Sequence, residues 1–170
     1  RRKDGSIFDI EVSVKYNDME GGRCITFMRD ITEHKKSQGL LEHAAQEWRT
    51  TFDSISAMIS LHDKDYKIRR VNKAFAAAFN MHPKDVIGTT CYELVHGTKE
   101  PPSFCPHKQV FDTQKPERAE FFEPRLGVWL SVAVSPIFDE EGKVASCVHV
   151  VENITTHKES EEKLLLALKE

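Results

Sequence analysis

The sequence predicts an α+β fold in which helices lie on one side of an antiparallel five-stranded sheet. Three observations predict it. Residues 58–71 and 117–151 form short apolar or alternating runs separated by turn residues, as strands do. Residues 72–114 hold short apolar segments interrupted by prolines and glycines, which favours short helices. Helical patterns at 32–55 and 156–168 flank this block, and antiparallel strands with grouped helices are typical of the α+β class.

Two further strands precede this block. Residues 6–16 alternate with a period of two, and residues 24–28 form a second apolar run. Residues 17–22 between them are turn formers, so the two runs predict a β-hairpin. From about residue 32 the apolar side chains recur at three and four, which predicts an amphipathic helix as far as residue 55.

The main block opens with strands at 58–61 and 67–71. Asn72 follows them as the predicted N-cap of a helix over 73–79, because a short polar side chain there can accept from a free backbone N–H. Pro83 suits the first turn of a second helix.

That second helix ends at Gly88, and residues 89–114 are predicted to be helical or irregular. Thr156 and Glu159 have the spacing of a capping box and predict the start of the final helix. The remaining predicted strands are 117–123, 128–135 and 144–151.

The composition excludes several classes of protein. Charged residues make up 30% of the 170 residues and the net charge is −3, which argues against a nucleic-acid partner. Apolar runs of membrane-spanning length and a signal peptide are both missing, so we expect no membrane contact in this segment. The four cysteines lack CxxC spacing, and we expect reduced thiols and a cytoplasmic location. We also expect the chain to be a piece of a longer protein.

The sequence contains an internal repeat. Residues 29–35 (RDITEHK) match residues 152–158 (ENITTHK), and both segments join a strand to a charged helix. A cysteine lies six residues before the Asp or Asn of each copy. The first 36 residues therefore look like the terminal hairpin of a domain whose second copy follows.

This strand, Asp-Ile-Thr, helix junction resembles the closing signature of PAS domains. Residues 3–6 (KDGS) resemble the turn before the penultimate PAS strand, and residues 68–75 (IRRVNKAF) and 83–88 (PKDVIG) resemble the first two short PAS helices with their flanks. Asn153 stands where the family has Asp, and it keeps the ability to form a hydrogen bond. The resemblance implies the following divisions: 1–36, the C-terminal hairpin of a truncated first PAS domain; 37–56, a helical linker; 57–156, a second PAS domain; and 157–170, the start of a C-terminal signalling helix.

The resemblance implies a sensory and dimerisation module. Such a module binds a small ligand or cofactor against the inner face of its sheet. It relays the signal through flanking helices to an output domain, which here would lie outside this chain, as in a sensor histidine kinase of a two-component system. We expect a homodimer through the flanking helices. The alternative is a structural dimerisation domain without a ligand. We find no phosphate-binding glycine loop, nucleophile elbow or HExxH motif, so we expect no enzyme activity.

Two thiols and two imidazoles gather in one stretch of the chain, at Cys91, His96, Cys105 and His107. Thiolate and imidazole together suit zinc or iron, so these four residues are candidate ligands of a metal or redox sensor. In the alternative interpretation, Cys91 packs as a small hydrophobe and His96 caps a helix end. A weaker hypothesis is a heme sensor, because heme-binding PAS domains carry their axial histidine on the helix where His107 lies.

The last strand predicts one wall of a ligand pocket. Period-two alternation places Cys147, His149 and Val151 on the same face. By the resemblance, Val151 occupies the position of the glutamine that reads the ligand in flavin-binding members, and valine disfavours a flavin because it forms no such hydrogen bond. His149 is either a pocket residue or a satisfied core histidine. The candidate pocket also includes three aromatic residues: Phe104 and Phe111 from the helical side and Phe121 from a strand.

Overall fold

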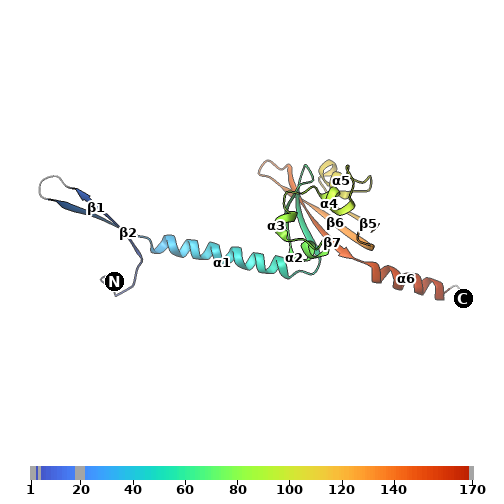
Figure 1. Ribbon diagram of the computed structural model, residues 1–170, viewed down its shortest axis with the longest axis horizontal. Helices are drawn as coiled ribbons and strands as arrows, with labels where there is room; N and C mark the ends of the chain where they lie inside the picture. Colours follow the sequence, from blue (N-terminus) through green and yellow to red (C-terminus); the bar gives the residue numbers. More distant parts are fainter. Residues whose placement is uncertain (1–2, 4, 18–21, 169–170) are drawn as a thin grey trace. The chain divides into compact units, whose positions relative to one another are not determined.

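The computed structural model describes residues 3, 5–17 and 22–168 of the chain (Figure 1). These residues fall into two compact units, with the division between Thr51 and Phe52. Most of the predicted turn at 17–22 lies outside the described residues, as do residue 4 of the segment 3–6 and the last two residues of the segment 157–170. Within the described part of the chain, the helices are too short or too polar to cross a membrane.

The first unit contains a β-hairpin followed by a long helix. Strands β1 (Ile10–Asn17) and β2 (Arg23–Asp30) pair antiparallel over their whole length. Helix α1 (Thr32–Ser54) follows after a single residue. The predicted hairpin and amphipathic helix are confirmed, since the change in apolar period occurs where the strand gives way to the helix.

The second unit is built on a five-stranded antiparallel sheet, which confirms the predicted fold class. The strand order is β4-β3-β7-β6-β5, so the last strand of the sequence lies at the centre of the sheet. β6 and β7 extend a few residues beyond the predicted 128–135 and 144–151. The strands are β3 (Met58–Asp63), β4 (Ile68–Val71), β5 (Glu117–Glu123), β6 (Val128–Phe138) and β7 (Val144–Asn153).

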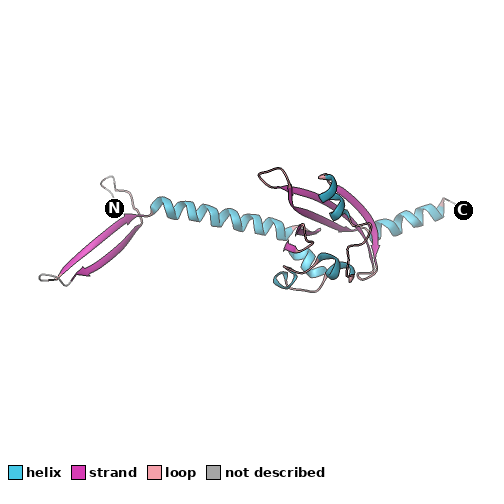
Figure 2. Cartoon of the chain, turned by 90° about the horizontal axis from the view of Figure 1, so that it is seen from above, coloured by secondary structure: helices cyan, strands magenta, loops and turns pink. Residues whose placement is uncertain are grey.

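Four short helices connect β4 to β5 (Figures 1 and 2). Proline opens α3 and α5, where its missing N–H would have had no intrahelical partner. Gly97 ends α4 in the left-handed conformation with φ of 67°, which glycine adopts without strain. The helices are α2 (Lys73–Ala78), α3 (Pro83–Val86), α4 (Cys91–His96) and α5 (Pro106–Thr113).

Strand register decides which side chains face the helices. Ser60 pairs with His149, and His62 with Cys147, across β3 and β7. All four side chains are buried, so they lie on the inner face of the sheet together. Two apolar clusters fill this side of the unit: Ile68, Val71, Phe75, Ala76 and Val86; and Val110, Leu130, Val132, Val134 and Cys147.

Asn72 is the predicted N-cap of α2, and the structure gives it a wider role. Its side-chain oxygen accepts hydrogen bonds from the N–H groups of Phe75 and Ile59, both at 3.0 Å. Its amide nitrogen donates to the carbonyls of Ile55 at 3.1 Å and Ala57 at 2.8 Å. The fully buried side chain therefore joins the start of α2 to the start of β3.

The repeated sequence has a repeated junction. In the first unit, the N–H of Ile31 donates to the carbonyl of Asp9, and the N–H of Asp9 donates to the Thr32 hydroxyl, both at 3.0 Å. The N–H of Thr32 donates to the side chain of Asp30 at 3.0 Å. These bonds fix the first turn of α1 against the chain that precedes β1.

The second unit repeats this pattern at the start of α6 (Thr155–Ala167). The N–H of Ile154 donates to the carbonyl of Trp129, and the N–H of Trp129 donates to the Thr155 hydroxyl, both at 2.9 Å. Asn153 accepts from the N–H of Thr155 at 3.0 Å, so it forms the hydrogen bond expected of it. Lys158 forms a 2.8 Å ion pair with Glu120 of β5.

The predicted capping box at Thr156 and Glu159 is wrong. α6 begins one residue earlier, its N-cap is Ile154, and that residue forms no side-chain cap bond. The Thr155 hydroxyl instead accepts a hydrogen bond from the N–H of Trp129 in β6, so it does not cap its own helix. Tertiary pairing thus takes precedence over the local capping pattern.

Candidate functional site

A small cavity of about 50 Å³ lies between the inner face of the sheet and the short helices of the second unit. Its walls are apolar or aromatic, apart from one serine, three histidines and two cysteines. A mostly apolar lining with a few polar groups is typical of small-molecule sites, which are usually larger, at about 300–1,000 Å³, so a ligand here has to be compact or widen the cavity. The lining residues are Met58, Ser60, His62, Phe75, Phe79, Cys91, Val95, His96, Phe104, Cys105, Pro106, Phe121, Leu126, Leu130, Val132, His149 and Val151.

The structure places four of the six predicted pocket residues on the cavity wall, namely Phe104, Phe121, His149 and Val151. The other two lie next to it. Cys147 belongs to the apolar cluster of β6 and α5, and Phe111 packs against that cluster.

The four predicted metal ligands do not come together as one group. Cys91, His96 and Cys105 line the cavity, whereas His107 faces other histidines. In the described part of the chain, the cluster of possible ligand atoms within 4.8 Å of one another comprises His62, His107 and His149. His96 instead bonds to Glu123, so the four residues that are neighbours in sequence have different partners in the fold.

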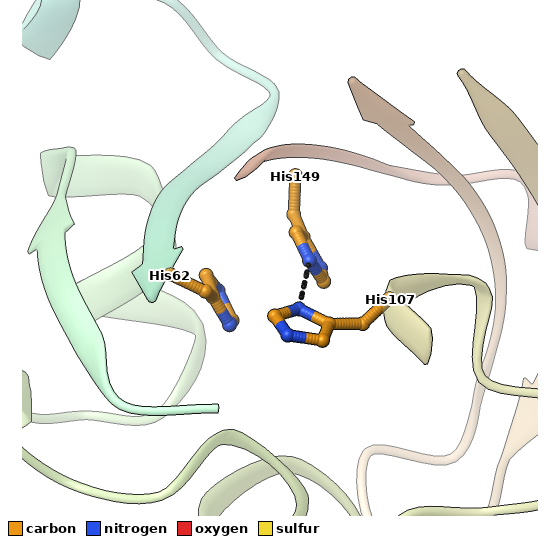
Figure 3. A group of neighbouring side chains, drawn as sticks. All are labelled: His62, His107 and His149. Carbon is orange, nitrogen blue, oxygen red and sulfur yellow. Dashed lines mark hydrogen bonds between the residues drawn. The ribbon is translucent and has the colours of Figure 1, made fainter. Parts of the chain in front are cut away.

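Three buried histidines from separate elements form this cluster (Figure 3). His62 lies on β3, His107 on α5 and His149 on β7. The rings of His62 and His149 stack in parallel, with centroids 3.9 Å apart and an angle of 2° between the planes. His107 Nδ1 lies 3.2 Å from His149 Nε2.

A thiol completes the group. Cys147 Sγ lies 3.1 Å from His107 Nδ1 and 3.3 Å from His149 Nε2. His62 Nε2 forms a 2.7 Å hydrogen bond with the Ser60 hydroxyl. The buried atoms His62 Nδ1 and His107 Nε2 have no hydrogen-bond partner among the described residues.

Burial keeps these side chains uncharged. Burial and the nearby His107 lower the pKa of His62 to about 3. Burial also lowers the pKa of His107 to about 4, although the charge of Asp63 opposes the shift. The pKa of His149 is held well below its usual 6.5 by burial beside the other two rings. Burial raises the pKa of the Cys147 thiol to about 12. At neutral pH the group therefore holds three neutral imidazoles and one thiol.

His62 was not among the site residues predicted from the sequence. A sequence pattern could have identified it, because the period-two alternation of residues 58–63 places His62 on the same face as Met58 and Ser60. The pattern alone does not place His62 beside Cys147. That proximity comes from the pairing of β3 with β7, in which the two residues are opposite each other.

A polar network that includes His96 of the cavity wall lies where α4 meets the end of β5. His96 Nδ1 donates to the buried carboxylate of Glu123 at 2.5 Å. The other carboxylate oxygen accepts from the N–H of Arg125 at 3.0 Å. The Arg125 guanidinium donates to the carbonyls of Glu93 and Leu94, at 2.9 and 2.6 Å. These bonds satisfy the end of α4 and connect it to the sheet.

Comparison with protein families identifies this arrangement of sheet, helices and cavity. A family model described as PAS fold matches residues 52–159, more than half of the chain. The chain belongs to the PAS family. A second model, described as PAS domain, matches residues 1–33. PAS domains are in general sensory modules, and the predicted family is confirmed. A comparison with curated proteins gave no match.

Solved PAS structures share the fold at low sequence identity. An RNA-binding light-oxygen-voltage receptor is 17% identical with a TM-score of 0.54, over 78% of this chain and 37% of that one. The chain thus spans about a third of that receptor. The PAS domain of BvgS from Bordetella pertussis is also 17% identical, with a TM-score of 0.54, over 75% of this chain and 97% of that domain. A sensory box sensor histidine kinase from Vibrio cholerae is 15% identical, with a TM-score of 0.50, over 70% and 98%.

Proposed function

We propose that the second unit is a sensory PAS module that binds a compact, mostly apolar ligand in its cavity. The observation that carries the proposal is an apolar cavity with imidazoles of His62 and His149 in its wall. An apolar wall favours burial of an apolar ligand, and a neutral imidazole orients a ligand that carries one polar hydrogen. The ligand class is therefore a small aromatic or aliphatic molecule with a single hydrogen-bond donor.

The relay to an output domain would start at β7. Val151 lines the cavity, and Asn153, two residues further along the strand, accepts a hydrogen bond from the first residue of α6. A ligand that displaces Val151 would strain this junction and shift α6 between two arrangements. The parent protein would then carry its output domain beyond α6, as a sensor histidine kinase does.

Filling the cavity tests the binding proposal, with indole as the probe and calorimetry in the presence of EDTA as the measurement. Val95→Phe places a ring in the cavity and is expected to weaken indole binding by about tenfold or more, which is 1.4 kcal/mol or more. Val144→Phe is the control, because Val144 begins β7 and does not line the cavity. Equal affinities for the two variants, or no binding by the unaltered protein, would count against the site.

Hydrogen exchange on the same samples tests the relay. Saturating indole is expected to change amide exchange in residues 154–168, in addition to the cavity wall. If protection changes only around the cavity, ligand binding stands and the relay does not.

A second role, self-association, is supported by the apolar residues of α6. Leu164 and Leu165 of the helix and Leu168 at its C-cap are exposed, and their spacing of three and four residues brings them to one face. Exposed leucines at this spacing suit a helix–helix seam. Leu165→Glu is expected to shift the chain from dimer to monomer in sedimentation equilibrium, while Glu162→Lys on the same helix leaves the mass unchanged. A monomer before any substitution would contradict the proposed seam.

A further inference from the structure

The three histidines and Cys147 leave hydrogen-bonding capacity unused in the core. His62 Nδ1 is buried without a partner among the described residues. An unpaired buried polar atom costs about 1–3 kcal/mol. An unpaired buried nitrogen beside two further imidazoles and a thiol suggests that the group serves a ligand of its own.

The geometry of the group matches one face of a tetrahedron. His107 Nδ1, His149 Nε2 and Cys147 Sγ form a triangle with sides of 3.2, 3.1 and 3.3 Å. In a tetrahedral zinc site, bonds of about 2.0–2.1 Å to nitrogen and 2.3 Å to sulfur place the ligand atoms roughly 3.3–3.5 Å apart. The triangle is therefore already close to the size that a zinc ion requires.

Hydrogen bonds alone cannot satisfy this triangle. Each ring nitrogen is either a donor or an acceptor, and the thiol carries one hydrogen. At most two of the three contacts can then be hydrogen bonds at the same time. A cation at the centre would instead accept a lone pair from every corner.

His62 is the candidate for a fourth ligand, because a ring nitrogen of His62 lies within 4.8 Å of a ring nitrogen of both other histidines. Its ring is held by the Ser60 hydroxyl at Nε2, which leaves the unpaired Nδ1 free for a metal. Because the rings of His62 and His149 are parallel and a metal–nitrogen bond lies in the ring plane, His62 must turn on binding. The adjacent cavity, which His62 lines, gives it room.

We propose that His62, His107, His149 and Cys147 form a zinc site in the core of the second unit. Three nitrogens and one sulfur in tetrahedral arrangement are a donor set that zinc prefers. Imidazole must be neutral to bind a metal, and these rings are neutral at pH 7. The Cys147 thiol loses its proton to the buffer when the zinc–sulfur bond forms, because a coordinating thiol is deprotonated by the ion. The site shares His62 and His149 with the wall of the small-molecule cavity, so ligand binding is measured in EDTA, where no zinc occupies these residues.

Metal titration of tag-free, EDTA-treated chain tests the proposal. Calorimetry with Zn²⁺ is expected to give one equivalent per chain, with proton release seen as a dependence of the heat on buffer. Co²⁺ is expected to give a tetrahedral visible spectrum with a thiolate-to-cobalt charge-transfer band. Cys147→Ser should abolish that band, whereas Cys91→Ser and Cys105→Ser should retain it.

Variants of the histidines locate the ion. His107→Gln and His149→Gln are expected to weaken Zn²⁺ binding by about 100-fold or more, while His43→Gln on the exposed part of α1 leaves it unchanged. NMR of the ring nitrogens in the unaltered protein removes any dependence on the folding of the variants. Zinc should shift His107 Nδ1, His149 Nε2 and His62 Nδ1. The absence of stoichiometric binding, or shifts confined to His96 and the other histidines, would overturn the site.

Discussion

Lowering the pH from 7 to 5 is expected to destabilise the metal-free protein by roughly 4–6 kcal/mol. The three core histidines are the cause. The folded-state pKa is about 3 for His62, about 4 for His107 and well below 6.5 for His149. Between these values and 6.5 the unfolded chain binds more protons than the folded one. The stabilising contribution is therefore complete above pH 6.5 and is lost as the pH falls towards the folded pKa values.

The size of this loss in stability follows from proton linkage. Each such histidine changes the free energy of unfolding by about 1.4 kcal/mol per pH unit, or about 2 kcal/mol between pH 6.5 and 5. Asp63 partly offsets the shifts of His62 and His107 through its negative charge. Domains of this size are stable by about 5–15 kcal/mol, so the loss is a large share of the total.

Urea unfolding at pH 7, 6 and 5, followed by circular dichroism in EDTA, measures this effect. The midpoint should fall steeply below pH 6.5 with an unchanged m-value. His149→Gln removes one of the three titrating groups and should make the decline shallower. A midpoint that stays constant from pH 7 to 5 would show that the histidines are not held neutral by the fold.

Replacing Asn72 by alanine is expected to cost about 3–4 kcal/mol of stability. The change removes the N-cap of α2, which is worth about 1 kcal/mol. It also leaves the carbonyls of Ile55 and Ala57 and the N–H of Ile59 without their partner, at about 1 kcal/mol each. Asn72 is fully buried, and its bonds to the N–H groups of Ile59 and Phe75 are buried with it.

The same urea experiment at pH 7 tests the prediction for Asn72. Lys73→Ala at the next, exposed position is the control and should change stability by less than about 0.5 kcal/mol. Asn72→Asp keeps the acceptor oxygen but loses both donor bonds and buries a charge, so it should be at least as destabilising as alanine. A loss of only about 1 kcal/mol for Asn72→Ala would mean that the residue acts as a helix cap alone.

Local patterns were enough to predict much of the fold. Period-two alternation gave the strands of the hairpin and the sheet, and the single residue Asn72 marked the start of α2. The same alternation placed His149 and Val151 on the face that borders the cavity. These features depend on neighbours in the sequence, so the sequence reveals them directly.

The histidine cluster was harder to predict because it depends on pairing between distant strands. His62 and Cys147 are opposite each other only through the register of β3 and β7, and a slip of one residue would move His62 to the other face. Conversely, the proximity of His96 and His107 in sequence suggested a shared site, yet His96 bonds to Glu123 of β5. Contacts between residues that are distant in sequence depend on how all the strands of the sheet pair.

The two matching junctions mark two positions at which this chain could be joined to other proteins. Ile31 and Thr32 are bonded to Asp9 in the same way as Ile154 and Thr155 are bonded to Trp129, so each helix starts at the same point relative to its own hairpin. Adding or deleting one residue after the threonine would rotate everything downstream by about 100° around the helix axis, whereas seven residues restore the direction to within about 20°. Chimaeras joined at Thr32 or Thr155 in steps of seven residues should therefore preserve the direction in which a following domain is presented.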